Sequence, residues 1–184
     1  MPVLLDDPLL DALRETEGKA EIVGGRIVPL MSTGFLPSYA AFQIAKALDL
    51  YAAEHGGFAA TDNLGFLVDL PGRRSFSPDA AYFLTAPENA MGFVEGAPLF
   101  AVEVRSERDY GPRAERELAA KRADYFAAGT RAVWDVDLQD ERATVWLYTE
   151  AEGEPVTFAR DDVATAGDAL AGFSVPVAAL YPPA

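Results

Sequence analysis

Residues 97–106 read APLFAVEVRS, an apolar segment that carries a single acidic residue, Glu103, near its end. Its β-branched and aromatic residues predict a buried strand. A carboxylate at the end of such a strand must be compensated by a metal ion, a cationic side chain or hydrogen bonds. Side chains alternate along a strand, so Arg105 is predicted on the same face as Glu103.

The neighbouring segments also have strand patterns. Gly24-Gly25 predicts a hairpin within EIVGGRIVPL, because both glycines accept positive φ. Three successive strands are predicted in LGFLVDL (64–70), PDAAYFL (78–84) and PLFAVEV (98–104), with PGRRSFS (71–77) as a turn between the first two. A further strand pair is predicted in TRAVWDVD (130–137) and ATVWLYT (143–149), joined through LQDER (138–142).

Helical spacing of apolar residues predicts two long helices, over 38–55 and 112–128. A shorter amphipathic helix over 3–16 predicts a peripheral element within residues 1–18. The chain contains no repeat or linker, so we expect a single domain over 1–184, of α/β class with a mixed central sheet. The first long helix has a predicted apolar face and the tail has predicted core residues: Phe42, Ala45, Leu48 and Ala52, and Leu170, Phe173, Val175, Val177 and Leu180.

The composition limits the possible partners. The chain has 184 residues, 15 of them basic and 29 acidic, and this net charge of −14 disfavours nucleic-acid binding unless a local basic patch overrides it. The absence of cysteine excludes disulfides and thiolate zinc sites. No apolar run approaches the roughly 20 residues of a membrane span, and the N-terminus lacks a signal-peptide pattern. We therefore expect a globular protein with no membrane partner and a cytoplasmic location.

Asp79, Glu103 and Lys121 are the candidate catalytic residues. Asp79 begins its predicted strand and Glu103 lies near the end of its own, so the two carboxylates meet if those strands are adjacent and antiparallel. Two oxygen ligands of this kind suit Mg²⁺ or Mn²⁺. A nearby lysine would orient a metal-bound water, and Arg105 would suit a phosphate clamp.

A structural interpretation of the same residues stays open. Pro-Asp is a common turn signature, and Glu103 could pair with Arg105 or Arg131. Trp134 and Trp146 lie in apolar strands, which favours core packing over base stacking.

Four stretches together resemble the Uma2 family, also called DUF820, of the PD-(D/E)XK nuclease superfamily. They are SPDAAYF, GAPLFAVEVRSERD, KRADYFAAGTRAVWDVD and LAGFSVPVAALY. The resemblance runs from about residue 21 to residue 180 and implies a restriction endonuclease-like fold. It implies that Asp79 and Glu103 bind Mg²⁺ or Mn²⁺, that Lys121 is the catalytic lysine, and that Glu21 approaches the metal from the other side.

The chain has Arg105 where the superfamily usually has lysine, so in this resemblance the lysine role passes to Lys121. Arg105 and Ser106 are then the predicted substrate-binding residues. The implied function is a Mg-dependent DNA endonuclease, with a homodimer as a possible assembly. The alternative is an inactive module on the same fold that binds nucleic acid or protein. The positions of four arginines distinguish these alternatives: Arg73, Arg74, Arg105 and Arg108. If they surround the site, DNA is favoured as the substrate, and if they pair with acids elsewhere, DNA binding is disfavoured.

Overall fold

The computed structural model describes residues 7–139 and 144–183. The helices are α1 (Pro8–Glu15), α2 (Phe35–His55) and α3 (Pro112–Ala127), with short 3-10 helices η1 (Gly167–Ala169) and η2 (Val177–Leu180). The strands are β1 (Ala20–Val23), β2 (Arg26–Pro29), β3 (Phe58–Thr61), β4 (Phe66–Leu70), β5 (Arg73–Phe76), β6 (Ala80–Phe83), β7 (Val94–Glu95), β8 (Phe100–Val104), β9 (Ala132–Asp137), β10 (Thr144–Tyr148), β11 (Val156–Ala159), β12 (Val163–Thr165) and β13 (Ser174–Pro176).

The strands form two main sheets and a small pair. The larger sheet has the order β11-β10-β9-β8-β6-β3, the second sheet has the order β2-β1-β5-β4-β7, and β12 pairs with β13. In the larger sheet β8 and β9 are parallel while the other pairs are antiparallel. Helix α3 connects the parallel pair, as such a crossover requires. The sheet is therefore mixed, which confirms the predicted fold class.

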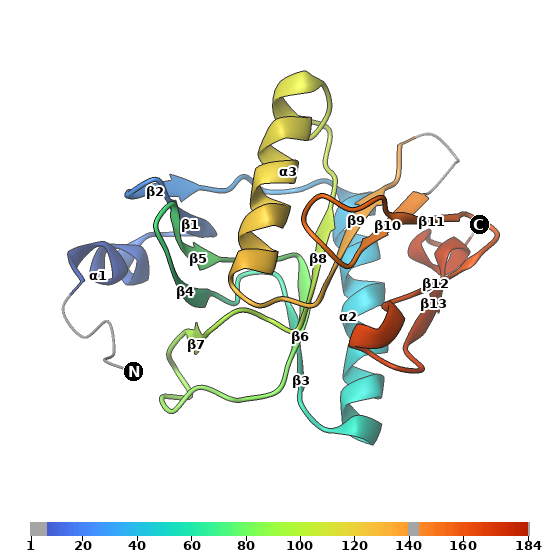
Figure 1. Cartoon of the computed structure of the whole chain (residues 1–184), viewed down its shortest axis with the longest axis horizontal. Coiled ribbons are helices and arrows are strands. Elements are labelled where there is room, and N and C mark those ends of the chain that lie inside the picture. The colour runs from blue at the N-terminus through green and yellow to red at the C-terminus, as the bar shows by residue number, and fades with distance from the viewer. Residues whose placement is uncertain (1–6, 140–143, 184) are drawn as a thin grey trace.

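Helix α2 covers one face of the larger sheet, and α3 lies with the second sheet on the other side (Figure 1). The alternation of side chains along β6 and β8 creates this layering. Ala80, Tyr82, Phe100 and Val102 pack toward α2, whereas Ala81 and Ala101 belong to the core that includes Tyr125 of α3. Glu103 follows Ala101 by two residues and so faces the space between the larger sheet and α3.

Most predicted elements are confirmed. Both glycines of the 24–25 hairpin have positive φ, β9 pairs with β10, and all five predicted tail residues are buried. Trp134 is buried in the core and donates to the carbonyl oxygen of Thr165 at 2.9 Å. Three predicted segments lie partly outside the described residues, namely the start of the helix over 3–16, the turn over 138–142 and the first residue of the strand over 143–149.

Other predictions were wrong in detail. Residues 71–77 do not form a single turn, because Arg73–Phe76 is strand β5, paired with both β4 and β1. The β5 side chains are mostly buried. The polar residues of this segment therefore belong to a buried strand, although their polarity had indicated a turn. Helix α2 begins at Phe35, three residues before the predicted start, and Phe42 is 55% exposed. The apolar face of α2 uses Ile44 instead.

Within the described residues, no helix has both the length and the apolar character needed to cross a membrane.

Substitution of Trp134 tests how much the core beneath the site contributes to the stability of the fold. The Trp134 ring contacts those of Phe100 and Phe173, with centroids 5.3 and 5.7 Å away. We expect Trp134→Ala to lower the free energy of unfolding by about 3–5 kcal/mol, because it removes buried surface and leaves a cavity. Urea unfolding measures this loss. The control Phe35→Ala, at a side chain that is 73% exposed, should change stability by less than about 0.5 kcal/mol.

Candidate active site

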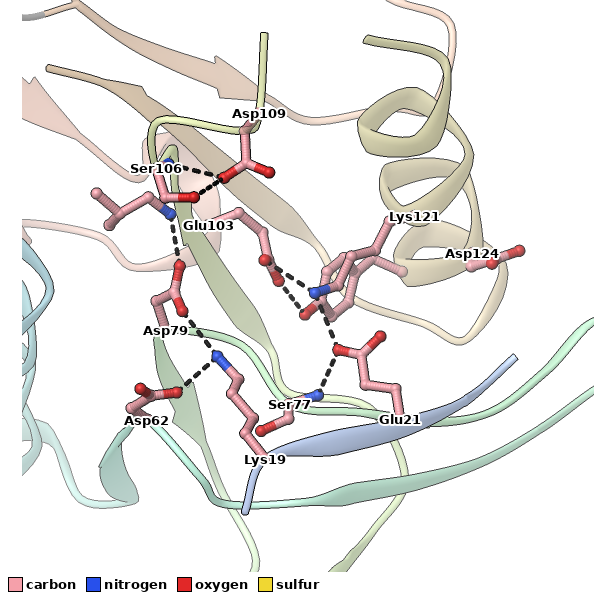
Figure 2. Close-up of polar contacts among 12 residues, drawn as sticks. Lys19, Glu21, Asp62, Ser77, Asp79, Glu103, Ser106, Asp109, Lys121 and Asp124 are labelled. Atoms are coloured by element: carbon pink, nitrogen blue, oxygen red, sulfur yellow. Dashed lines mark hydrogen bonds and ion pairs between the residues drawn. The ribbon is translucent and has the colours of Figure 1, made fainter. Parts of the chain in front are cut away.

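Asp79 and Glu103 come from neighbouring antiparallel strands. Ala80 pairs with Val102, and the Asp79 amide donates to the Val102 carbonyl oxygen at 3.0 Å, so Asp79 lies just before β6. The Asp79 Oδ2 atom accepts a hydrogen bond from the Val104 amide at 2.8 Å. This bond fixes Asp79 against the end of β8, next to Glu103, as the predicted strand pairing requires. Figure 2 shows both carboxylates at this end of the sheet.

Helix α3 supplies two partners to Glu103. The Lys121 Nζ atom lies 2.8 Å from Glu103 Oε2, and the Tyr125 hydroxyl donates to Oε1 at 2.6 Å. Residues four apart share one helix face, so both side chains reach the same carboxylate. Tyr125 is fully buried and stacks on Phe76, with ring centroids 4.0 Å apart. The carboxylate is therefore held by a packed helix face, and Lys121 and Tyr125 take the place of the predicted partners Arg105 and Arg131.

Glu21 lies on the opposite side of Lys121 from Glu103 (Figure 2). Its Oε1 atom lies 2.9 Å from Lys121 Nζ and accepts from the Ser77 amide at 2.9 Å. Its Oε2 atom accepts from Arg73 at 2.6 Å, and Arg73 also donates to Asp124 of α3 at 2.8 Å. Glu21 thus connects β1, β5 and α3, and both of its oxygens have partners.

Lys19 completes the set of cations. Its Nζ atom lies 2.8 Å from Asp79 Oδ1 and 2.6 Å from Asp62 Oδ1. Lys19 immediately precedes β1 and is two residues from Glu21, so the two side chains leave the chain on the same side. The prediction from sequence missed Lys19. The two-residue spacing from Glu21 was the signal that could have found it.

Burial and charge set the protonation of this cluster. Burial raises the pKa of Glu103 to about 7, and the charges of Asp79 and Glu21 act in the same direction against the opposing effect of Lys121. Burial acts to lower the pKa of Lys121, but Glu103 and Glu21 together hold it above its usual value. Lys121 therefore stays protonated at neutral pH and can act as a cation, not as a general base.

Arg105 belongs to a neighbouring cluster. Its guanidinium donates to Asp135 at 2.7 and 2.8 Å and also to Glu115, and it lies over the ring of Trp146 at 5.0 Å. Asp135 pairs in register with Glu103, so the two clusters lie side by side on one sheet face. The predicted substrate residue Ser106 donates its hydroxyl to Asp109 at 2.8 Å. Neither predicted substrate residue contacts Asp79 or Glu103 in these interactions.

The other arginines follow the same pattern. Arg73 pairs with Glu21 and Asp124, and Arg74 pairs with Asp7 at 3.1 Å. Arg108 is exposed and contacts the sulfur of Met31. Of the four arginines predicted to distinguish DNA binding, three are therefore neutralised by acids.

The carboxylates of Asp79 and Glu103 offer hard oxygen donors, which suit a hydrated divalent cation. Each carboxylate lies against a lysine ammonium group, which indicates that a cation is favourable there. Among residues 7–139 and 144–183, no group of three or more His, Cys, Asp or Glu side chains is arranged to hold a metal. A cation at Asp79 and Glu103 would thus keep water on its other positions, as Mg²⁺ commonly does. The buried Ser77 hydroxyl, without a partner among the described residues, adds an unused oxygen two residues before Asp79.

A family model for Uma2, described as "Putative restriction endonuclease", matches residues 7–178. The chain belongs to the Uma2 family. The matched range includes every residue of the site described above, from Lys19 to Tyr125. A search of curated proteins gave no match.

A solved structure supports the fold of this Uma2 chain. It is the crystal structure of "a putative nuclease belonging to DUF820" from Anabaena variabilis, with a TM-score of 0.72 and 17% sequence identity. The match covers 95% of this chain and 97% of that one. The Uma2 chain therefore has the restriction endonuclease-like fold, and this agrees with the resemblance seen in its motifs.

Arg105 provides a test of structural against substrate-binding roles. Its side chain and that of Asp135 are 6% and 4% exposed. We expect Arg105→Met to lower the free energy of unfolding by about 3–5 kcal/mol, since it leaves the buried Asp135 carboxylate without its cation. Chemical denaturation measures the change.

The control is Arg113→Met, because Arg113 is 86% exposed and pairs with Glu117 on the same helix as the site lysine. It should change stability by less than about 1 kcal/mol. If Arg105→Met were as stable as this control, the ion pair between Arg105 and Asp135 would not contribute to stability, and Arg105 would be available to bind phosphate.

Proposed function

We propose that this Uma2 protein is a metal-dependent DNA endonuclease that hydrolyses phosphodiester bonds, with Mg²⁺ or Mn²⁺ as its cofactor. The observation that carries the proposal is the meeting of Asp79, Glu103 and Lys121 at one end of the larger sheet. Asp79 lies just before β6, Glu103 lies in β8 and Lys121 lies in α3. The resemblance implies the same three residues as the catalytic set. The family description and the solved DUF820 nuclease support a nuclease as the class of activity.

Each side chain has a distinct part in this proposal. Asp79 and Glu103 would hold the cation, and the Val104 amide and the Tyr125 hydroxyl would keep their carboxylates oriented. A Mg²⁺ ion held there would supply charge to the phosphoryl oxygen and lower the pKa of a bound water. Lys121 stays protonated, so it would orient the attacking water and stabilise negative charge that develops on the phosphate.

Glu21 has a supporting part. Because Lys121 Nζ lies between Glu103 and Glu21, the second carboxylate holds the ammonium in place when Glu103 turns toward a cation. We propose this positioning role for Glu21 in addition to the metal-facing role implied by the resemblance.

A second candidate is a module on the same fold that binds a partner without cutting. The net charge of −14 and the pairing of Arg73, Arg74 and Arg105 with acids disfavour DNA as a partner, and so favour a module that binds protein. A nuclease of this charge would depend on its metal ion and on a homodimer or other partner to hold DNA.

Cleavage of supercoiled plasmid and single-stranded DNA tests the proposal. With Mg²⁺ or Mn²⁺ present, we expect the wild type to cut, and Asp79→Asn, Glu103→Gln and Lys121→Met each to lower the rate by at least about 100-fold. The reason is that each change removes a proposed ligand of the cation or the positive charge beside the reacting phosphate.

Arg113→Gln is the matched control, since Arg113 lies on α3 in an exposed ion pair with Glu117. It should cut as fast as the wild type. An inert wild type, or cutting that survives all three site substitutions, would exclude the endonuclease and leave the binding module as the better proposal.

A further inference from the structure

Lys19 is bound to a residue of the proposed metal site. Its ammonium lies between two carboxylates, 2.8 Å from Asp79 Oδ1 and 2.6 Å from Asp62 Oδ1. The Lys19 side chain is 13% exposed, whereas that of Asp62 is 46% exposed. Figure 2 shows the lysine reaching across from the start of β1 to both acids.

The ammonium occupies the one oxygen of Asp79 that a cation could use without disturbing the sheet. Oδ2 accepts from the Val104 amide at the end of β8, and Oδ1 accepts from Lys19. A divalent cation bound at Oδ1 would lie within a few ångströms of the ammonium, where two positive charges repel strongly. Metal and Lys19 therefore exclude each other at this oxygen.

Lys19 can leave Asp79 more readily than Lys121 can leave Glu103. Lys121 lies between two mostly buried carboxylates. Its departure would leave Glu103 without its cation, although Glu21 would keep Arg73. Lys19 keeps a second acceptor, Asp62, which is half exposed and lies in the turn after β3. The flexible lysine stem can stay attached to Asp62 while Asp79 changes partner.

We propose that Lys19 is the resident counter-ion of Asp79, which competes with the divalent cation and is retained by Asp62 when the cation binds. The inference rests on the proposed function, because it assigns to Lys19 the control of metal affinity at that same site. In the metal-free protein the lysine offsets the repulsion between Asp79 and Glu103. The divalent cation then occupies the site only when its concentration is high enough to displace the lysine from Asp79.

Titration calorimetry with Mn²⁺ tests this role. We expect Lys19→Met to bind Mn²⁺ about tenfold more tightly than the wild type, since a partly buried competing ion pair is removed. Lys19→Arg keeps the charge and should bind within about threefold of the wild type. Lys19→Met should also unfold at a lower temperature in EDTA and gain more than the wild type on addition of Mn²⁺.

Two further variants separate the possible outcomes. Lys46→Met, at an exposed lysine of α2, controls for the loss of one positive charge and should leave Mn²⁺ affinity unchanged. Asp79→Asn should abolish the binding. If the wild type binds Mn²⁺ through Asp79 but Lys19→Met binds equally or more weakly, the counter-ion role is wrong and the metal site stands. If the wild type binds no Mn²⁺, both the metal site and the role of Lys19 are wrong.

Discussion

The ion pair between Glu103 and Lys121 is the interaction on which the site depends. Glu103 is the next-to-last residue of an apolar strand and faces the space between the larger sheet and α3, so its charge needs a cation there. Lys121 supplies that cation from a helix that also buries Tyr125 on Phe76. The packing of α3 and the charge balance of the site thus depend on each other, because Tyr125, which packs, and Lys121, which supplies the charge, lie on one helix face.

The second sheet extends this arrangement. Strands β1 and β5 bring Glu21 and Arg73 to Lys121 and Asp124, so an alternating series of acids and bases joins the second sheet to α3. Such a series satisfies charges that would otherwise be costly to bury. It also leaves the Lys121 ammonium between two carboxylates, where it remains protonated. Burial raises the pKa of Glu103 to about 7, against the opposing effect of Lys121.

Two arginines of this chain, Arg73 and Arg105, are buried and serve the structure. Arg105 lies in the position where the superfamily usually has lysine, yet its guanidinium is held by Asp135 and Glu115 beside the Trp146 ring. A planar group with several donors can satisfy two acids at once, which a lysine in this place would do less well. The site lysines instead come from the segment before β1 and from α3.

Much of the fold was determined by local sequence patterns. The apolar run over 98–104, the glycine pair at 24–25 and the helical spacing over 112–128 each predict an element that the structure contains, because each pattern depends only on residues close together in the chain. The prediction missed strand β5 because Arg73, Arg74 and Ser75 are polar, and polar side chains are buried only when they have partners from distant parts of the chain. Arg73 pairs with Glu21 and Asp124, at 52 and 51 residues along the chain, and the Ser75 hydroxyl accepts from the Ile22 amide, 53 residues away.

The sequence by itself identified Asp79, Glu103 and Lys121 as a candidate set, through strand position and family resemblance. The tertiary structure alone decided which charges meet. It brought Lys19 to Asp79 across 60 residues, turned Arg105 toward Asp135 and set Tyr125 against Glu103. Charge pairing acts through space and depends on the register of strands and the packing of a helix. The periodicity of the sequence therefore does not predict which charged side chains pair.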